Sequence, residues 1–169
     1  MAALVAVGLR LFVLEPFVVP SAAMAPTLQP GDRILVVKAG FLAGAVGRGE
    51  IVVIRHPDSS SCATVGASVP DLVTRVIGLP GETIWSVSGT VYIDGRPLKE
   101  TGWYDRSSGP LGSAAIGRTT IPRDGYFVMS DNRADTCDSR SFGTVSGSAI
   151  VGRVVAIVAR HGHPTLHFV

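Results

Sequence analysis

Short apolar runs separated by turn residues make up most of this 169-residue chain. Runs rich in Val and Ile at 34–37, 51–54 and 72–77 are each flanked by Gly, Pro or Asp, which is the pattern of strands between turns. The stretch "GTVYIDGRPL", residues 89–98, predicts a hairpin with an Asp-Gly turn. Together these runs predict a mostly β fold.

The remaining segments extend this pattern toward both ends of the chain. "LFVLEPFVV", residues 11–19, predicts a first strand, and "GRVVAIVAR", residues 152–160, predicts a last buried one. Only residues 144–150 are expected to hold a helical turn. Residues 100–120 are rich in Gly and Ser with weak patterning, and we interpret about 95–122 as a loop-rich insertion.

The first 19 residues are apolar but interrupted by Arg10 and Glu15. A bilayer-spanning helix needs about 20 uninterrupted apolar residues, so residues 1–9 are too short alone. They fit either the end of a longer anchor or an interfacial segment. We therefore expect a membrane-proximal anchor remnant and first strand over 1–19, followed by one domain over 20–169.

The composition and net charge of the chain indicate which classes of partner it can bind. Charged residues make up 17% of the chain and the mean hydropathy is +0.37, which favours an exposed apolar surface. The net charge is only +2, and the basic residues are scattered without interleaved aromatics. This distribution argues against nucleic-acid binding.

No cofactor or metal is expected from the sequence. The histidines are His56, His161, His163 and His167, and neither they nor the cysteines follow a zinc spacing. The tail "RHGHPTLHF" is expected to be a mobile terminus. No serine lies in a G-x-S-x-G elbow. Cys62 and Cys137 would pair in an oxidising compartment or remain separate thiols in the cytosol, and their spacing does not decide between these states.

Three segments concentrate the residue types that carry chemistry. The loop "PSAAMAPTLQPGD", residues 20–32, is stiffened by prolines but has two alanines where a nucleophile would be expected. The second segment is "DLVTRVIGLPGE", residues 71–82. The third, residues 130–143, is dense in Asp and Arg, and its Asp138 and Arg140 can pair within a turn. The ordinary interpretation of such a charged run is a solvated loop.

Four stretches in order resemble the successive motifs of type I signal peptidases: "PSAAMAPTLQPGDRILV", "LVTRVIGLPGETI", "GTVYIDGRPL" and "GYFVMSDNRADTCDSRSFGTV". The resemblance runs from about residue 11 to residue 158. It implies antiparallel β-sheets in a partly open barrel, held on the outer face of a membrane. It also implies cleavage of signal peptides after small residues, commonly Ala-x-Ala. Such enzymes use a Ser–Lys dyad, in which a neutral lysine with a pKa lowered by burial is the general base.

The resemblance places the two reacting groups at residues that cannot perform the reaction. The nucleophile position falls on Ala23, and the general-base position falls on Thr74. Ser21 falls on the hydroxyl of the oxyanion hole, and Thr136 falls on the serine that orients the lysine. The chain has only two lysines, Lys38 and Lys99, and neither lies in a matching motif.

The resemblance also assigns supporting roles. Asp138 and Arg140 fall on a structural salt bridge, with Arg75 nearby. The walls of the pockets for small substrate side chains fall on Phe17, Val19, Met24, Leu28 and Val73. Because the domain would lie outside the cytoplasm, the resemblance implies a disulfide between Cys62 and Cys137.

Three interpretations follow from these assignments. The first is an inactive homologue that binds an extended apolar or Ala-x-Ala segment, or a partner protein, beside a lipid surface. The second is a signal peptidase inactivated by an engineered substitution at Ala23. The third is a hydrolase that uses another nucleophile. Three departures at one site, Ala23, Thr74 and Thr136, favour the first interpretation.

Overall fold

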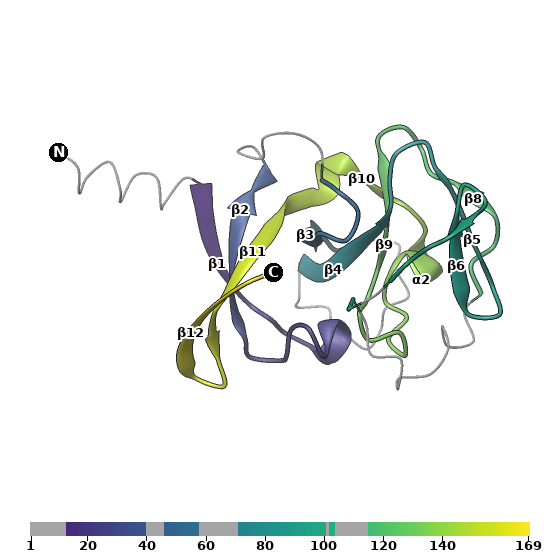
Figure 1. Ribbon diagram of the computed structural model, residues 1–169. Helices are drawn as coiled ribbons and strands as arrows, with labels where there is room; N and C mark the ends of the chain where they lie inside the picture. Colours follow the sequence, from purple (N-terminus) through teal and green to yellow (C-terminus); the bar gives the residue numbers. More distant parts are fainter. Residues whose placement is uncertain (1–12, 40–45, 58–70, 101, 104–114) are drawn as a thin grey trace.

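The structure is a computed structural model that describes residues 13–39, 46–57, 71–100, 102–103 and 115–169 (Figure 1). Strands dominate the described part of the chain, as predicted, and the helices there are single turns. No helix in these ranges is long and apolar enough to cross a membrane. Of the predicted anchor remnant and first strand over 1–19, residues 1–12 lie outside the described residues.

The larger sheet has the strand order β1-β2-β11-β3-β4-β9-β10, with β12 pairing on β11, and it curls into a partly open barrel (Figure 1). Every pair of neighbouring strands is antiparallel. Its strands are β1 (Leu14–Val18), β2 (Arg33–Lys38), β3 (Ile51–Arg55), β4 (Asp71–Gly78), β9 (Gly125–Met129), β10 (Val145–Ser146), β11 (Ile150–Arg160) and β12 (His163–Phe168).

The central strand β3 shows how the core is divided. Ile51 and Val53 belong to one apolar cluster, whereas Val52 and Ile54 belong to another. Because side chains alternate between the two faces of a strand, both faces of β3 are covered. This explains why the sequence "IVVI" is apolar without alternation. The first cluster includes Val19, Met24 and Leu28 from the loop after β1. This loop therefore packs against the larger sheet.

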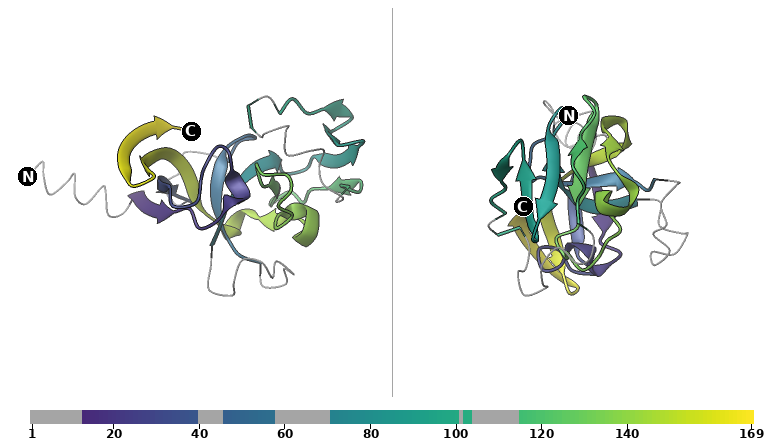
Figure 2. Two further views of the ribbon diagram at one scale, coloured as in Figure 1. Left: turned by 90° about the horizontal axis from the view of Figure 1, so that it is seen from below. Right: turned by 90° about the vertical axis from the view of Figure 1, so that its right-hand side faces the viewer.

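A smaller sheet packs at the end of the molecule opposite β1 and β12 (Figures 1 and 2). Its order is β7-β6-β5-β8, from β5 (Thr83–Val87), β6 (Thr90–Ile93), β7 (Arg96–Pro97) and β8 (Thr119–Thr120). The turn between β6 and β7 has positive φ at Asp94 and Gly95, 48° and 84°, as a type I′ hairpin requires. The predicted Asp-Gly hairpin is therefore confirmed, and the division into domains stays a prediction.

The expectation of helical structure at 144–150 alone is wrong. A 3-10 turn does occur there, η4 (Gly147–Ala149), but two more turns lie at the loops of interest: η1 (Ala22–Met24) and α2 (Ser139–Phe142). Each begins after a polar side chain that accepts a backbone N–H; Ser21 caps η1 and Asp138 caps α2. A helix of one turn is too short to show a periodic pattern of apolar residues. In the sequence, only its N-cap residue indicates it.

The expectation of a mobile C-terminal tail is also wrong. Residues His163–Phe168 form β12, which pairs with β11. The chain reverses through His161 and Gly162, both with positive φ, 50° and 81°. A His-Gly pair can adopt the positive φ angles that a two-residue hairpin turn requires. The strand itself gives no apolar pattern in the sequence, because every side chain of β12 is exposed.

Candidate functional site

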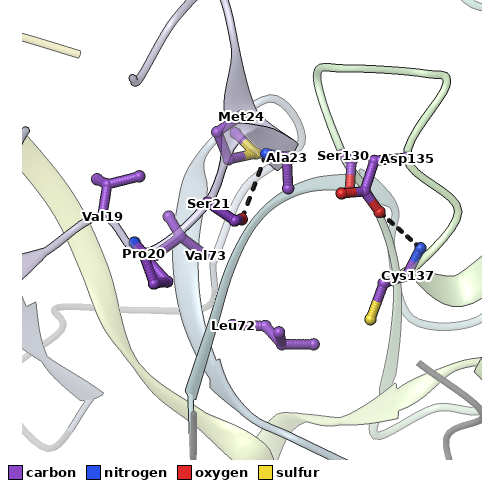
Figure 3. Close-up of a pocket in the computed structure, with 10 residues that line it drawn as sticks. All are labelled: Val19, Pro20, Ser21, Ala23, Met24, Leu72, Val73, Ser130, Asp135 and Cys137. Carbon is purple, nitrogen blue, oxygen red and sulfur yellow. Dashed lines mark hydrogen bonds between the residues drawn. The ribbon is translucent and has the colours of Figure 1, made fainter. Parts of the chain in front are cut away.

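A shallow pocket lies where the loop after β1, the strand β4 and the loop after β9 meet (Figure 3). Its enclosed volume is only about 10 Å³, and the rest of the hollow is open to solvent. Its lining consists of Val19, Pro20, Ser21, Ala23, Met24, Leu72, Val73, Ser130, Asp135 and Cys137. The three segments singled out in the sequence therefore converge on one hollow.

The turn η1 presents Ser21 and Ala23 to this pocket. Ser21 is extended, with φ −143° and ψ 171°, and its Oγ accepts the N–H of Ala23 at 3.3 Å (Figure 3). Asn132, in the loop after β9, donates its backbone N–H to the carbonyl of Ala23 at 2.9 Å. This bond fixes the position of η1 relative to the opposite wall of the pocket. The half-buried Ala23 contributes only a methyl group as its side chain.

Thr74 lies on β4, opposite Val52 of β3, and its relative exposure is 3%. Its Oγ1 is buried and has no hydrogen-bond partner among the described residues. A buried polar group without a partner costs about 1–3 kcal/mol of folding free energy. Thr74 is therefore an unfavourable residue for this position if stability alone decides.

A buried ion pair holds the loop after β1 in position. Arg75 of β4 donates to Asp131 through Nε at 2.7 Å and Nη2 at 2.6 Å, and Asp131 is completely buried. Thr27 donates its hydroxyl to the same carboxylate at 2.6 Å. Arg75 also donates to the carbonyl of Gly49 at 2.6 Å. The loop that carries Ala23 is thus bonded both to β4 and to the segment after β9.

A second buried pair holds the segment after β9. Asp138 accepts from Nε and Nη2 of Arg140, at 2.9 and 2.6 Å to the nearer oxygens, and both side chains have no exposed area. The Asp138 carboxylate also accepts the backbone N–H groups of Ser130 and Arg140, at 2.9 and 3.0 Å. Arg140 in turn donates to the carbonyls of Arg133 and Asp135.

The charged run at 130–143 is therefore not the solvated loop that its composition ordinarily indicates. Asp131, Arg133 and Asp138 are buried, and Arg133 pairs with the buried Glu100 at 2.5 Å. Arg75, which the resemblance places near the Asp138–Arg140 pair, is bonded to Asp131. Because buried charges need partners, the ion pairs account for this density of charge.

The structure separates the proposed wall residues into two groups. Val19, Met24 and Val73 line the pocket. Phe17 and Leu28 do not, and both pack into the first apolar cluster, where Leu28 is fully buried. Thr136 is exposed and outside the lining.

Sequence reasoning missed four lining residues: Pro20, Leu72, Ser130 and Asp135. Leu72 could have been found, since it neighbours Val73 on a strand. Asp135 gave no distinguishing signal, because it is one of several acidic residues in the same run.

Cys137 is disulfide-bonded in the structure and lines the pocket. Cys62 lies outside the described residues, so its pairing with Cys137 stays a prediction. Within the described ranges, no group of three or more His, Cys, Asp or Glu side chains is arranged to hold a metal ion.

The sequence is similar to those of known proteins. Residues 1–159 match the family described as signal peptidase, peptidase S26. The chain is 37% identical to signal peptidase I of Leptolyngbya laminosa over 150 residues, covering 89% of this chain and 71% of that protein. The chain belongs to the signal peptidase family. It is also 34% identical to signal peptidase I T of Bacillus subtilis strain 168 over 157 residues, covering 89% of this chain and 77% of that one.

A solved signal peptidase I from Enterococcus faecalis V583 is 28% identical, covers 65% of this chain and 97% of that chain, and superimposes with a TM-score of 0.48. For this signal peptidase family member, the family roles of Ala23, Thr74, Ser21 and Thr136 remain proposals. The geometry brings Ser21 and Ala23 together at one pocket and leaves Thr136 outside its lining.

Proposed function

We propose that this signal peptidase family member binds an extended segment with small side chains at the outer face of a membrane and does not cut it. The observation that carries the proposal is the methyl group of Ala23, the middle residue of η1. The surrounding loop is held in place by Asn132 and by the buried Arg75–Asp131 pair. A loop that is held in place but presents an unreactive side chain is suited to binding a peptide without covalent chemistry.

The chemistry of the two positions supports inactivity. A methyl group has no lone pair with which to attack a carbonyl, and a threonine hydroxyl does not accept a proton at neutral pH as a neutral amine does. Neither lysine of the chain lines the pocket. Lys38 ends β2 and contacts Glu15 at 3.4 Å, and Lys99 is exposed.

The edge of β4 supports strand-like binding. Residues 71–74 pair with β3 on one side, whereas the pairing of β4 with β9 begins only at Arg75. Backbone groups of an extended peptide can bond to such an edge and add to the sheet as a strand. Alternate small side chains of that peptide would then enter the pocket beside Val73 and Ala23.

An apolar face of the larger sheet supports contact with lipid. Pro16, Leu35, Ala156 and Phe168 are paired in turn across β1, β2, β11 and β12. Of these, Ala156 is buried, Leu35 is half-buried, and Pro16 and Phe168 are exposed. Phe168 is 72% exposed, and the neighbouring Val18 and Leu166 are 60% and 66% exposed. Exposed apolar patches of this kind mark interaction surfaces. This face lies at the end of the molecule that carries β1 and β12 (Figure 1).

Peptide titration tests the binding part of the proposal. A blocked peptide containing Ala-x-Ala is titrated against the full chain in detergent, and against Val73→Trp, which fills the pocket. Val87→Trp is the matched control, because Val87 is 55% exposed on β5 and outside the lining. We expect saturable binding to the unchanged chain and to Val87→Trp, and loss of binding in Val73→Trp. Equal affinity for all three proteins, or no binding to any, contradicts the proposal.

A further inference from the structure

We infer that Trp103 is a positioning residue for the pocket: it holds Arg75 against Asp131 and thereby keeps the loop that carries Ala23 in its binding position. This inference rests on the proposed function, since it concerns how the binding site keeps its shape. Trp103 follows the strand β7 of the smaller sheet in the chain and is not part of the pocket lining.

The indole of Trp103 lies on Arg75 and on the backbone of Gly49. The guanidinium carbon Cζ of Arg75 is 5.7 Å from the centroid of the indole ring. Gly49 has a φ of 87°, and a β-carbon placed on it would lie 2.5 Å from Cζ2 of Trp103. The carbonyl of Gly49 accepts Nη1 of Arg75 at 2.6 Å. Trp103 therefore contacts both the cation and the backbone segment to which that cation is bonded.

This contact affects the strength of the ion pair beneath the pocket. A guanidinium is weakly hydrated and stacks on aromatic faces, where the ring quadrupole attracts its charge. Arg75 is only 7% exposed, and the half-buried Trp103 lies over it. Exclusion of water strengthens the attraction between Arg75 and Asp131. Removal of the indole is therefore expected to admit water to the guanidinium and to loosen the pair.

The contacts continue from Arg75 to the loop after β1. Nε and Nη2 of Arg75 donate to Asp131 at 2.7 and 2.6 Å. The hydroxyl of Thr27 donates to the same carboxylate at 2.6 Å. Thr27 lies four residues after Ala23 in the loop. The route from Trp103 to the pocket thus passes through Arg75, Asp131 and Thr27, and each step is a direct contact.

The segment that ends in Trp103 also holds the opposite wall of the pocket. Trp103 donates its backbone N–H to the carbonyl of Glu100 at 3.3 Å. The carboxylate of Glu100 pairs with Arg133 at 2.5 Å, and Nε of Arg133 donates to the carbonyl of Ser130 at 3.0 Å. Ser130 lines the pocket. One short segment is therefore connected to both sides of the binding site.

A purely structural role is the alternative, because Trp103 also packs against the apolar cluster that includes Ile77 and Met129. The other tryptophan provides a matched control. Cζ of Arg118 lies 4.5 Å from the centroid of the Trp85 ring, so Trp85 makes the same kind of contact with a different arginine. Neither residue of that pair lines the pocket or takes part in the route through Asp131.

The test is a titration of a labelled, blocked peptide containing Ala-Gln-Ala, followed by fluorescence anisotropy, against the full chain in detergent. The variants are Trp103→Leu, Trp103→Phe and Trp85→Leu, and circular dichroism checks that each is folded. We expect binding to weaken about tenfold in Trp103→Leu and about threefold in Trp103→Phe, whose smaller ring keeps part of the contact. Trp85→Leu should bind within about twofold of the unchanged chain.

Thr27→Val separates positioning from a general loss of stability. If Trp103 acts through Thr27, then adding Trp103→Leu to Thr27→Val should weaken binding by no more than about a further twofold, whereas independent effects would multiply. If Trp103→Leu does not fold, Trp103→Phe is measured in both chains, and its threefold loss should disappear in the Thr27→Val chain.

Three results overturn the inference and leave the proposed function standing. They are unchanged affinity in folded Trp103 variants, an equal loss in Trp85→Leu, and the same loss with and without Thr27→Val. Any of them would make Trp103 a core residue only. Failure of the unchanged chain to bind the peptide overturns both the inference and the proposed function.

Discussion

The framework of buried ion pairs beneath the pocket differs from the two positions, Ala23 and Thr74, that the family resemblance assigns to the reacting groups. In the framework, Asp131 and Asp138 are fully buried carboxylates whose oxygens each accept several hydrogen bonds. At the other two positions, Ala23 offers a methyl group, and Thr74 buries a hydroxyl that has no partner among the described residues. The hydrogen bonds described above that position the loop at this pocket therefore involve neither the methyl group of Ala23 nor the hydroxyl of Thr74.

This separation has a physical basis. Loop position is set by the hydrogen bonds and ion pairs of residues such as Thr27, Arg75 and Asn132, none of which carries a reacting atom. We therefore expect the shape of the pocket to be insensitive to which side chain stands at residue 23. Loss of the framework would remove the shape itself. The following predictions test that contrast, from the largest expected effect to the smallest.

Asp138→Ala is expected to cost about 3–5 kcal/mol of unfolding free energy, because it leaves the buried Arg140 charge unpaired and frees two backbone N–H groups. Chemical denaturation monitored by circular dichroism gives the value. The exposed Asp124→Ala serves as control and should change stability by less than about 0.5 kcal/mol. A cost below about 1 kcal/mol for Asp138→Ala would show that the framework is not held by this pair.

The Cys62–Cys137 disulfide is expected to contribute up to about 4 kcal/mol by restricting the unfolded chain, less any strain in the folded state. Mass spectrometry of protein alkylated without reduction should show no free thiol when the chain is isolated from an oxidising compartment. Cys62→Ser and Cys137→Ser should then destabilise the fold to a similar extent. Detection of two free thiols rules the pairing out.

Thr27→Val should destabilise the fold by about 1.5–3 kcal/mol, because it removes a donor to the buried Asp131 carboxylate. Hydrogen exchange should also become faster at the amides of residues 23–28, since the loop loses its bond to the framework. Unchanged exchange and unchanged stability together would mean that the ion pair alone positions this loop.

Thr74→Val, the same substitution in the other region, should have the opposite sign. It replaces a buried hydroxyl without a partner by a methyl group of similar size, so we expect a gain of up to about 1 kcal/mol. The measurement is the denaturation midpoint relative to that of Thr27→Val under the same conditions. Loss of stability in both variants would contradict the contrast between the two regions.

The strands could be predicted from the sequence because burial imposes its pattern directly. The runs at 34–37, 51–54 and 72–77 lie within β2, β3 and β4. The strand β12 could not be predicted in this way, since its side chains are exposed and its pairing is set by the turn at His161 and Gly162.

The site was predictable only in part, for a different reason. Sequence motifs place Ser21, Ala23 and Val73 near one another, and the structure brings them to one pocket. They do not state which carboxylate pairs with which arginine. That pairing follows from three-dimensional packing, which directs Arg75 to Asp131. Leu28 illustrates the same limit, because its burial in the core depends on contacts distant in sequence.

Cleavage of a pre-protein carrying an Ala-x-Ala site, incubated in lipid with the full chain, tests the central claim most directly. The account predicts no product with the unchanged chain, and cleavage only when Ala23→Ser and Thr74→Lys are introduced together. Either change alone should do little, because nucleophile and base act as a unit. Cleavage by the unchanged chain at a rate near that of an intact family member would contradict the account.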